Sequence, residues 1–468
     1  MSRTPKILCI LTLFLFLLLF VQERTHFIGA RSLKGAFEYP AEFPDITWQG
    51  WKNGSLQQGL ERYSKDHFGF REGAIRTHNQ LLWTLFHQNN TNGAVQIGKD
   101  NYLYEPYFVE DHYESRMYKY TSSPEELLQR WQRTISRLVK IQEILDEHHT
   151  TLFLACLPGK DRIFPEYLPP RDTLTRAKGP VAIECMPAIF DSLGLRYVNI
   201  CQWFERLKGH TSYPLFTPLG THWSNIASVY GFDSILHYME RVGNCTFPPY
   251  LIGAPHEGPT RKPDADLADL MNLVFPIRTA VPNQYVEVRA LPSKDTSAAK
   301  PGLIVIGDSF FWNVEDNFPL NDLFRYHHYW YYFNTIYFDP DHDNTASIDL
   351  VAQLADADYV MLSYCSAQLY DIGVNTAIPG MDFETRALIE LCYDPAEIDA
   401  KVAEIAGMIR ADEGWLASLQ QKAATAGVSL EEQLRTDARY LLYTNPEQYF
   451  PALAEPHPTP RCSRWRQS

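Results

Sequence analysis

The triplet Gly307-Asp308-Ser309 is the best candidate for covalent chemistry in this sequence. It follows an apolar run over residues 302–306 that predicts a buried β-strand. Open α/β sheets place reactive residues at the carboxyl ends of their strands, so a serine here would stand at the functional edge. Its hydroxyl can serve as a nucleophile, and its backbone N–H can face a developing oxyanion. The alternative interpretation is a polar turn, because such triplets also follow strands by chance.

His222 is the best candidate for the base that a serine nucleophile requires. It lies in Gly220-Thr221-His222-Trp223-Ser224, directly before a segment with the pattern of a helix. Loop-to-helix junctions commonly hold active-site residues. The alternative is a packed or capping histidine, which is the commoner role for a histidine before a tryptophan. Asp308 adjoins the serine, and we expect it to hold the turn by accepting backbone N–H bonds.

Residues 324–333 form an unusually aromatic segment. Aromatic rings stack on the apolar faces of sugars, and a neighbouring arginine can bond sugar hydroxyls. Arg325, Tyr329 and Trp330 are therefore candidate substrate-binding residues. Burial of the rings in the core is the alternative.

The sequence predicts neither a metal site nor a cofactor. Asp339, Asp341 and Asp343 have the spacing that opens a calcium loop, but the glycine and glutamate that complete such a loop are missing. The eight cysteines form no Cys-x-x-Cys pair. Lys160 and Arg162 are candidates for steering an anionic substrate, or for pairing with the acidic surface.

The composition is that of an ordinary globular protein and argues against one class of partner. The 468 residues can bury a large core, and a hydrophobic fraction of 45% excludes disorder over most of the length. Lys and Arg number 42 against 56 Asp and Glu, so the formal net charge is −14. Binding to phosphates needs a concentrated basic surface, and we therefore expect no nucleic-acid partner.

The N-terminus predicts a membrane anchor. Arg3 and Lys6 precede an unbroken apolar run over residues 7–21. A cleaved signal peptide would be followed closely by a small-x-small site, and Ile28-Gly29-Ala30 is a late and poor match. We expect a retained single-pass anchor in the inner (cytoplasmic) membrane, with the rest of the chain in the periplasm or outside.

Beyond the anchor, the sequence predicts an α/β domain with a parallel sheet flanked by helices. Strand-like runs occur at residues 151–157, 196–200, 302–306, 335–338 and 359–362. Helical patterns alternate with them at residues 123–145, 180–193 and 224–241, and a β-hairpin is expected at 95–104. We divide the chain into an anchor (1–22), a stalk (23–60), the α/β domain (61–375), a helical C-terminal extension (376–450) and a polar tail (451–468).

Several motifs occur in an order that resembles the alginate O-acetyltransferase AlgX/AlgJ family. These are Phe68-Gly69-Phe70-Arg71, the hairpin at 96–104, Leu157-Pro158-Gly159-Lys160, Thr221-His222-Trp223 and Gly307-Asp308-Ser309-Phe310. The likeness covers roughly residues 60 to 370, and the ordered set of motifs makes it specific.

This resemblance implies a circularly permuted SGNH-hydrolase-like domain with Ser309 as nucleophile and His222 as base. It further implies O-acetylation of a cell-surface or exported polysaccharide, with the acetyl group delivered by a membrane-bound O-acyltransferase. A carbohydrate esterase would use the same residues with water as acceptor. A protein of another class, a non-catalytic polysaccharide-binding or scaffold subunit of an export complex, is also consistent with the sequence.

One departure from the family bears on activity. The alginate enzymes place an aspartate two positions before the histidine, and here that position is Gly220. The residues Asp264, Asp266 and Asp269 form the nearest acidic cluster, and Asp266 is our candidate substitute for orienting His222. The alternatives are a Ser–His dyad, an inactive site, and an acidic cluster that is only a solvated loop.

Overall fold

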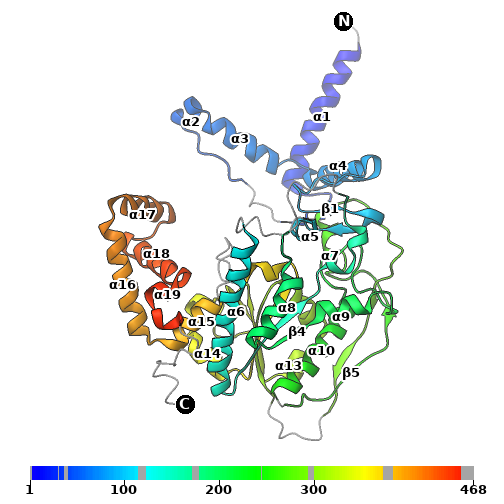
Figure 1. The fold of residues 1–468 in the computed structure, drawn as a ribbon. Coiled ribbons are helices and arrows are strands. Elements are labelled where there is room, and N and C mark those ends of the chain that lie inside the picture. The colour runs from blue at the N-terminus through cyan, green and yellow to red at the C-terminus, as the bar shows by residue number, and fades with distance from the viewer. Residues whose placement is uncertain are drawn as a thin grey trace.

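The computed structural model describes residues 3–29, 31–35, 41–113, 123–170, 179–243, 245–292, 300–372 and 383–454. At its centre lies a six-stranded sheet (Figure 1). The order of its strands is β11 (Thr335–Tyr337), β10 (Tyr326–Tyr331), β9 (Gly302–Gly307), β12 (Tyr359–Cys365), β3 (Thr151–Leu157) and β4 (Tyr197–Asn199). The strands are parallel except for β11, which pairs antiparallel with β10. The predicted α/β class is therefore confirmed.

The sheet corrects two expectations drawn from the sequence. The aromatic segment forms β10, a strand that we had not assigned, and β10 runs parallel beside β9. The strand expected at 335–338 is the antiparallel edge strand β11. Aromatic residues favour strands as strongly as branched aliphatic residues do, so this run has the composition of a buried strand.

Each face of the sheet buries its own hydrophobic core. Leu152, Leu154 and Cys156 of β3 point to one core, whereas Phe153 and Ala155 point to the other. This alternation follows from the two-residue repeat of a β-strand. Because both faces are covered, the central strands are continuous apolar runs.

Two sets of helices cover these faces (Figure 1). One set comprises α6 (Pro124–Glu147), α8 (Ala182–Leu193), α14 (Leu350–Asp356) and α15 (Phe383–Cys392). The other comprises α7 (Lys160–Ile163), α9 (Ile200–Leu207), α10 (Asn225–Gly243), α12 (Trp312–Asn317) and α13 (Leu320–Leu323). The helix α6 begins as expected, because the Ser123 hydroxyl accepts the Glu126 N–H and Pro124 takes the first helical position.

The helical C-terminal segment predicted from the sequence is also present. Within the predicted range 376–450, α15 covers the sheet, and the residues after it form α16 (Pro395–Ala411), α17 (Glu413–Ala426), α18 (Leu430–Thr444) and α19 (Pro446–Tyr449) at one side of the sheet domain (Figure 1). Arg137 of α6 makes a two-pronged ion pair with Glu447 of α19, at 2.8 and 2.7 Å. Such a pair fixes the relative position of the two helices.

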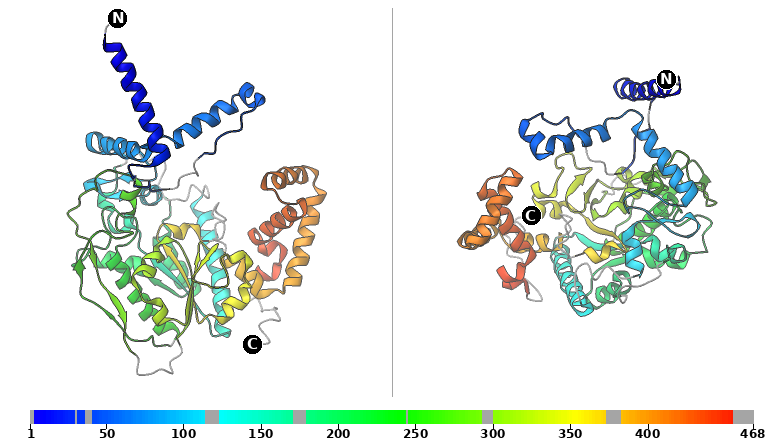
Figure 2. Two further views of the ribbon diagram at one scale, coloured as in Figure 1. Left: turned by 180° about the vertical axis from the view of Figure 1, so that it is seen from behind. Right: turned by 90° about the horizontal axis from the view of Figure 1, so that it is seen from above.

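Four helices lie between residues 3 and 86 of the described chain. They are α1 (Arg3–Thr25), α2 (Trp48–Asn53), α3 (Ser55–Asp66) and α4 (Arg71–Phe86). The helix α1 projects from the body, while α2, α3 and α4 extend sideways near its foot (Figures 1 and 2). The stretch Lys6–Thr25 of α1 is long and apolar enough to cross a membrane, a property that signal sequences share. The boundary that we expected at residue 60 falls inside α3.

Short elements complete the fold. The expected hairpin is formed by β1 (Gln96–Ile97) and β2 (Leu103–Tyr104), followed by α5 (Pro106–Tyr113). Between α10 and β9 lie α11 (Asp266–Leu270) and two small antiparallel pairs: β5 (Tyr250–Ile252) with β8 (Val288–Ala290), and β6 (His256–Glu257) with β7 (Gln284–Tyr285). Cys9, Cys156, Cys185, Cys201, Cys245 and Cys365 are free thiols.

Candidate active site

The turn that carries Ser309 is pinned to the end of a neighbouring strand. A side chain on Gly307 would place its Cβ 2.3 Å from the carbonyl oxygen of Ser363, so only glycine allows this approach of β9 to β12. Asp308 accepts N–H bonds from Phe310 at 3.0 Å and from Cys365 at 2.7 Å, as expected for a residue that holds the turn. Ser309 is half-buried and begins a 3₁₀ turn that leads into α12.

The structure brings the three candidate residues into one chain of hydrogen bonds. The Nε2 atom of His222 lies 2.9 Å from the hydroxyl oxygen of Ser309. Its Nδ1 atom lies 2.6 Å from a carboxylate oxygen of Asp266. Nucleophile, base and orienting carboxylate thus stand in the geometric relationship of a serine triad.

Two further hydrogen bonds join the segment that carries His222 to the turn that carries Ser309. The indole N–H of the buried Trp223 donates to the carbonyl of Phe310 at 3.0 Å. In the other direction, the amide of Asn313 donates to the carbonyl of Trp223 at 2.8 Å. The residue after His222 is therefore bonded to the residue after Ser309, which fixes the distance between the two reacting side chains.

The loop that leads to Asp266 occupies the space where a side chain at position 220 would lie. A Cβ at Gly220 would lie 2.6 Å from the carbonyl oxygen of Pro263. Asp266 also accepts N–H bonds from Thr221 at 2.8 Å and from Leu267 at 2.7 Å, the latter in the first turn of α11. Three donors thus orient this carboxylate, and one of them belongs to the residue next to His222.

Asp264, from the same acidic cluster, has a different position. It is buried and accepts bonds from the backbone N–H of Asn225 at 3.2 Å and from its side-chain amide at 2.9 Å. This attaches the 263–266 loop to the start of α10, directly after the histidine segment. Asp269 instead forms an ion pair with Arg31 at 3.8 Å.

The surroundings raise the pKa of the His222 imidazole. Burial alone would lower this pKa, but the hydrogen bond and charge of Asp266, with the charges of Glu105 and Asp308, outweigh burial. Glu105 follows β2, and burial raises the pKa of its own carboxyl. A raised imidazole pKa means that the site stabilises the imidazolium that forms when His222 takes a proton.

Lys160 is buried beneath the loop that leads to His222 and does not face the solvent. Its ammonium is fully buried and donates to the carbonyls of Leu103 at 2.8 Å, Pro218 at 2.9 Å and Gly220 at 2.7 Å. Burial lowers the pKa of Lys160 to about 7. The expectation that Lys160 steers substrate is wrong, because no part of this side chain reaches the surface. Sequence reasoning missed its contact with the histidine loop.

A cavity of about 400 Å³ opens beside the three residues. Its walls include His222, Asp266 and Ser309, together with Lys262, Trp312 and Asn313. Lys34 and Gly35, which follow α1 in the chain, also line it. Lys34 is fixed there by two bonds between its backbone and the side-chain amide of Asn272, at 2.8 and 2.9 Å.

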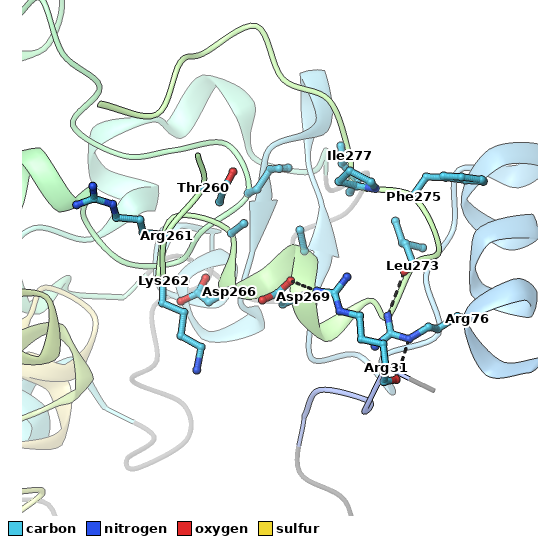
Figure 3. A pocket seen from close by; sticks show the side chains of 14 residues that line it. Arg31, Arg76, Thr260, Arg261, Lys262, Asp266, Asp269, Leu273, Phe275 and Ile277 are labelled. Atoms are coloured by element: carbon cyan, nitrogen blue, oxygen red, sulfur yellow. Dashed lines mark hydrogen bonds and ion pairs between the residues drawn. The ribbon is translucent and has the colours of Figure 1, made fainter. Parts of the chain in front are cut away.

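A second cavity of about 350 Å³ adjoins the first, with Lys262, Asp266 and Asp269 in the walls of both (Figure 3). Arg31 reaches toward Asp269 from the N-terminal segment. The guanidinium of Arg76 holds that segment by donating to the carbonyls of Arg31 at 3.4 Å and Ser32 at 2.7 Å. Residues 31–35, which follow α1, thus form part of the walls of both cavities.

The three candidate substrate-binding residues do not line either cavity. Tyr329 and Trp330 are fully buried on opposite faces of β10, one in each core. The hydroxyl of Tyr329 donates to the carbonyl of Asp308 and so braces the serine turn from inside. Arg325 lies at the other end of β10 and pairs with Asp356 and Asp358. An alternation of face along one strand makes simultaneous exposure of Tyr329 and Trp330 to one ligand impossible.

Comparisons with known proteins gave matches among solved structures. No protein-family model and no curated protein matches the sequence. The O-acetyltransferase domain of Pseudomonas putida AlgJ is 14% identical, with 59% of this chain and 92% of that chain covered and a TM-score of 0.38. Bacillus cereus PatB1 is 11% identical, with 59% and 96% covered and a TM-score of 0.35. Pseudomonas aeruginosa AlgX is 11% identical, with 60% and 67% covered and a TM-score of 0.34. At these values the likenesses transfer no residue role to this chain.

Proposed function

We propose that this chain is an O-acetyltransferase that acts on a cell-surface or exported polysaccharide through Ser309, His222 and Asp266. The observation that carries the proposal is the unbroken chain of hydrogen bonds from the Asp266 carboxylate through the His222 ring to the Ser309 hydroxyl, at 2.6 and 2.9 Å. The motif order that resembles the AlgX/AlgJ family supports the same reaction.

In the first half-reaction, the Ser309 oxygen attacks the carbonyl carbon of the donor's acetyl group, and the serine proton passes to His222 Nε2. The donor group then leaves with that proton, and Ser309 carries the acetyl ester. In the second half-reaction, a sugar hydroxyl gives its proton to His222 and attacks the ester carbon. The Ser309 oxygen leaves and regains the proton, so the acetyl group has moved to the sugar.

The donor in this proposal delivers acetyl groups at a membrane surface, as a membrane-bound O-acyltransferase would. Lys34, in the wall of the cavity, follows the end of α1 at Thr25 by nine residues. Nine residues span at most about 30 Å, so the cavity stays within that distance of the foot of α1. We place α1 across the inner membrane as a single-pass anchor and the α/β domain on the periplasmic side.

For the acceptor sugar we propose a platform around Trp312. This half-buried ring lines the cavity and lies 4.7 Å from the ring of Tyr337 and 6.0 Å from that of Phe338, between centroids. Tyr337 and Phe338 are 37% and 49% exposed, so the three rings continue the cavity wall to the surface. A single exposed ring of this group can stack on the apolar face of a sugar while the sugar keeps its hydroxyls in water.

The first test of the proposal is an acetyl-ester assay on the purified full chain in detergent. We expect release of 4-nitrophenol from its acetate by the wild-type protein and none above background by Ser309→Ala. The matched control is Ser347→Ala, which changes a surface serine in a distant turn. Equal rates for wild type and Ser309→Ala would exclude the Ser309 mechanism. They would favour the alternative of a non-catalytic scaffold subunit.

A second assay separates transferase from esterase. With an oligosaccharide present, a transferase yields a product that is heavier by one acetyl group, and ester turnover rises with acceptor concentration. An esterase gives acetate alone, at a rate that the oligosaccharide does not raise. Mass spectrometry of the oligosaccharide distinguishes the two outcomes.

A further inference from the structure

The helices at the foot of α1 carry a concentration of exposed apolar side chains. On or beside α2 these are Phe43, Ile46, Trp48 and Trp51, at 56%, 76%, 72% and 57% exposure. On α4 they are Leu81, Leu85 and Phe86, at 52%, 65% and 64% exposure. Single exposed apolar residues are normal on a soluble protein, but such clusters mark interaction surfaces.

The outward face of α4 carries no Asp, Glu, Lys or Arg. Its exposed residues are Gly73, Ala74, Thr77, His78, Leu81, Thr84, Leu85 and Phe86. The helix's charged residues are half-buried or buried: Arg71 and Glu72 lie in the first turn, and Arg76 holds the N-terminal segment. Phe275, 68% exposed, lies beside this helix, since its N–H bonds the side chain of Gln80. A helix that lay against water would present a charged or strongly polar face.

The junction of α3 and α4 contacts α1 within the apolar stretch itself. A Cβ on Gly69 would meet the carbonyl oxygen of Leu19 at 2.2 Å and the Cβ of Gln22 at 2.8 Å, so glycine is needed for this close contact. Leu19 lies six residues before Thr25, about 9 Å along the helix axis. If α1 crosses a bilayer, the junction is therefore sunk into the outer interfacial layer.

We propose that α2, α3 and α4 rest on the outer surface of the lipid bilayer, with the apolar side chains of α2 and α4 inserted between the headgroups. Trp48 and Trp51 would then lie at the depth where tryptophan is enriched, and Lys52, 5.4 Å above the Trp48 ring, would reach the lipid phosphates. The inference rests on the anchor placed in the membrane under the proposed function.

Such a surface would fix the orientation of the active-site cavity, which a single helical anchor alone leaves free to swing. The foot of α1 and the α4 helix both hold the N-terminal segment that lines the cavity, through the chain itself and through Arg76. Contact of α4 with lipid therefore holds Ser309 at one height above the membrane.

Quenching of tryptophan fluorescence tests this inference on the full chain. Wild type and the Trp48→Phe/Trp51→Phe variant are reconstituted in phosphatidylcholine–phosphatidylglycerol vesicles, with or without lipid brominated near the headgroups. Two of the ten tryptophans are removed, so we expect the bromine-sensitive share of the emission to fall by about a fifth of the total. The matched control is Trp415→Phe, a 39% exposed residue of α17 that should leave the bromine effect unchanged.

The outcomes separate the surface from the anchor. Retention in the vesicles after carbonate washing, with a reduced bromine effect in the double variant, supports both. Retention with the same bromine effect in wild type and double variant overturns the lipid surface and leaves the anchor, as expected if the apolar face binds a protein. Loss from the vesicles on washing overturns anchor and surface together, while the Ser309→Ala assay still decides the chemistry.

Discussion

Gly220 and Pro263 approach so closely that no side chain fits between them, and this contact brings Asp266 to His222. The carbonyl oxygen of Pro263 would lie 2.6 Å from a Cβ at position 220. The carboxylate that faces His222 thus belongs to Asp266, 44 residues after the histidine. Gly220, two residues before the histidine, has no side chain that could take this role.

An aspartate at this position should therefore harm the site. We expect Gly220→Asp to displace the 263–266 loop and to lower kcat/KM for an acetyl ester by about 100-fold, the scale of a 1 Å misplacement. The control is Gly407→Asp in α16, where a Cβ has no neighbour within 4 Å. A Gly220→Asp enzyme with wild-type or higher activity would contradict the role given to Asp266.

Asp266→Asn should reduce kcat by about 10⁴-fold, because an amide neither stabilises the imidazolium nor holds the required tautomer. Asp399→Asn, which removes a carboxylate from a surface ion pair, should be silent. Comparable rates for the two variants would mean that the site works as a Ser–His dyad.

The pH profile carries a separate expectation. His222 must be neutral to accept the serine proton, so activity should fall as the pH drops through its pKa. Since Asp266 helps to raise that pKa, the acid limb of kcat/KM should lie above the ordinary histidine value in wild type and move to lower pH in Asp266→Asn. A limb that does not move would place the titrating group elsewhere.

Lys160→Met should affect both stability and turnover. The variant leaves three buried carbonyls without their donor, at about 1–3 kcal/mol each, so we expect a loss of about 3 kcal/mol or more in the free energy of unfolding. It also frees the loop before His222, so kcat should fall more than KM changes. Lys208→Met, at an exposed ion pair with Glu166, should cost less than about 1 kcal/mol. Denaturant unfolding and ester kinetics measure the two effects.

Trp312→Ala should weaken use of a sugar acceptor without abolishing hydrolysis of a small ester. Loss of a stacking ring should raise KM for the oligosaccharide about tenfold, the equivalent of 1.4 kcal/mol. Tyr440→Ala, exposed on α18, is the control. A rise in KM for the small ester of the same size would show that Trp312 shapes the serine pocket and is not specific to sugar.

The sequence predicted those elements whose pattern lies within a single segment of the chain. Apolar runs predicted β3, β9 and β12, and Ser123 with Pro124 predicted the start of α6. The strand β10 was missed because its aromatic residues resemble a binding segment as much as a core strand. Burial distinguishes the two, and burial depends on neighbours far along the chain.

The site shows the same division. Ser309 and His222 each follow from local context, whereas proximity in the sequence indicates only the acidic cluster of Asp264, Asp266 and Asp269. The hydrogen bond to His222 distinguishes Asp266 from the other two. Lys160 could not be interpreted in this way, since its three acceptors come from segments 57 to 60 residues distant. Lys34 lies farther still, 238 residues from the asparagine that fixes it, and no local pattern marks it as part of a pocket.

The five residues 31–35 also decide how the protein should be prepared. Arg31 lines one cavity and Lys34 and Gly35 the other, although all three precede every element of the sheet domain. A water-soluble fragment that starts after residue 35 would have an open, unfinished pocket. If this fragment failed to turn over an acetyl ester, the cause would be the missing wall. The role of Ser309 would stay undecided.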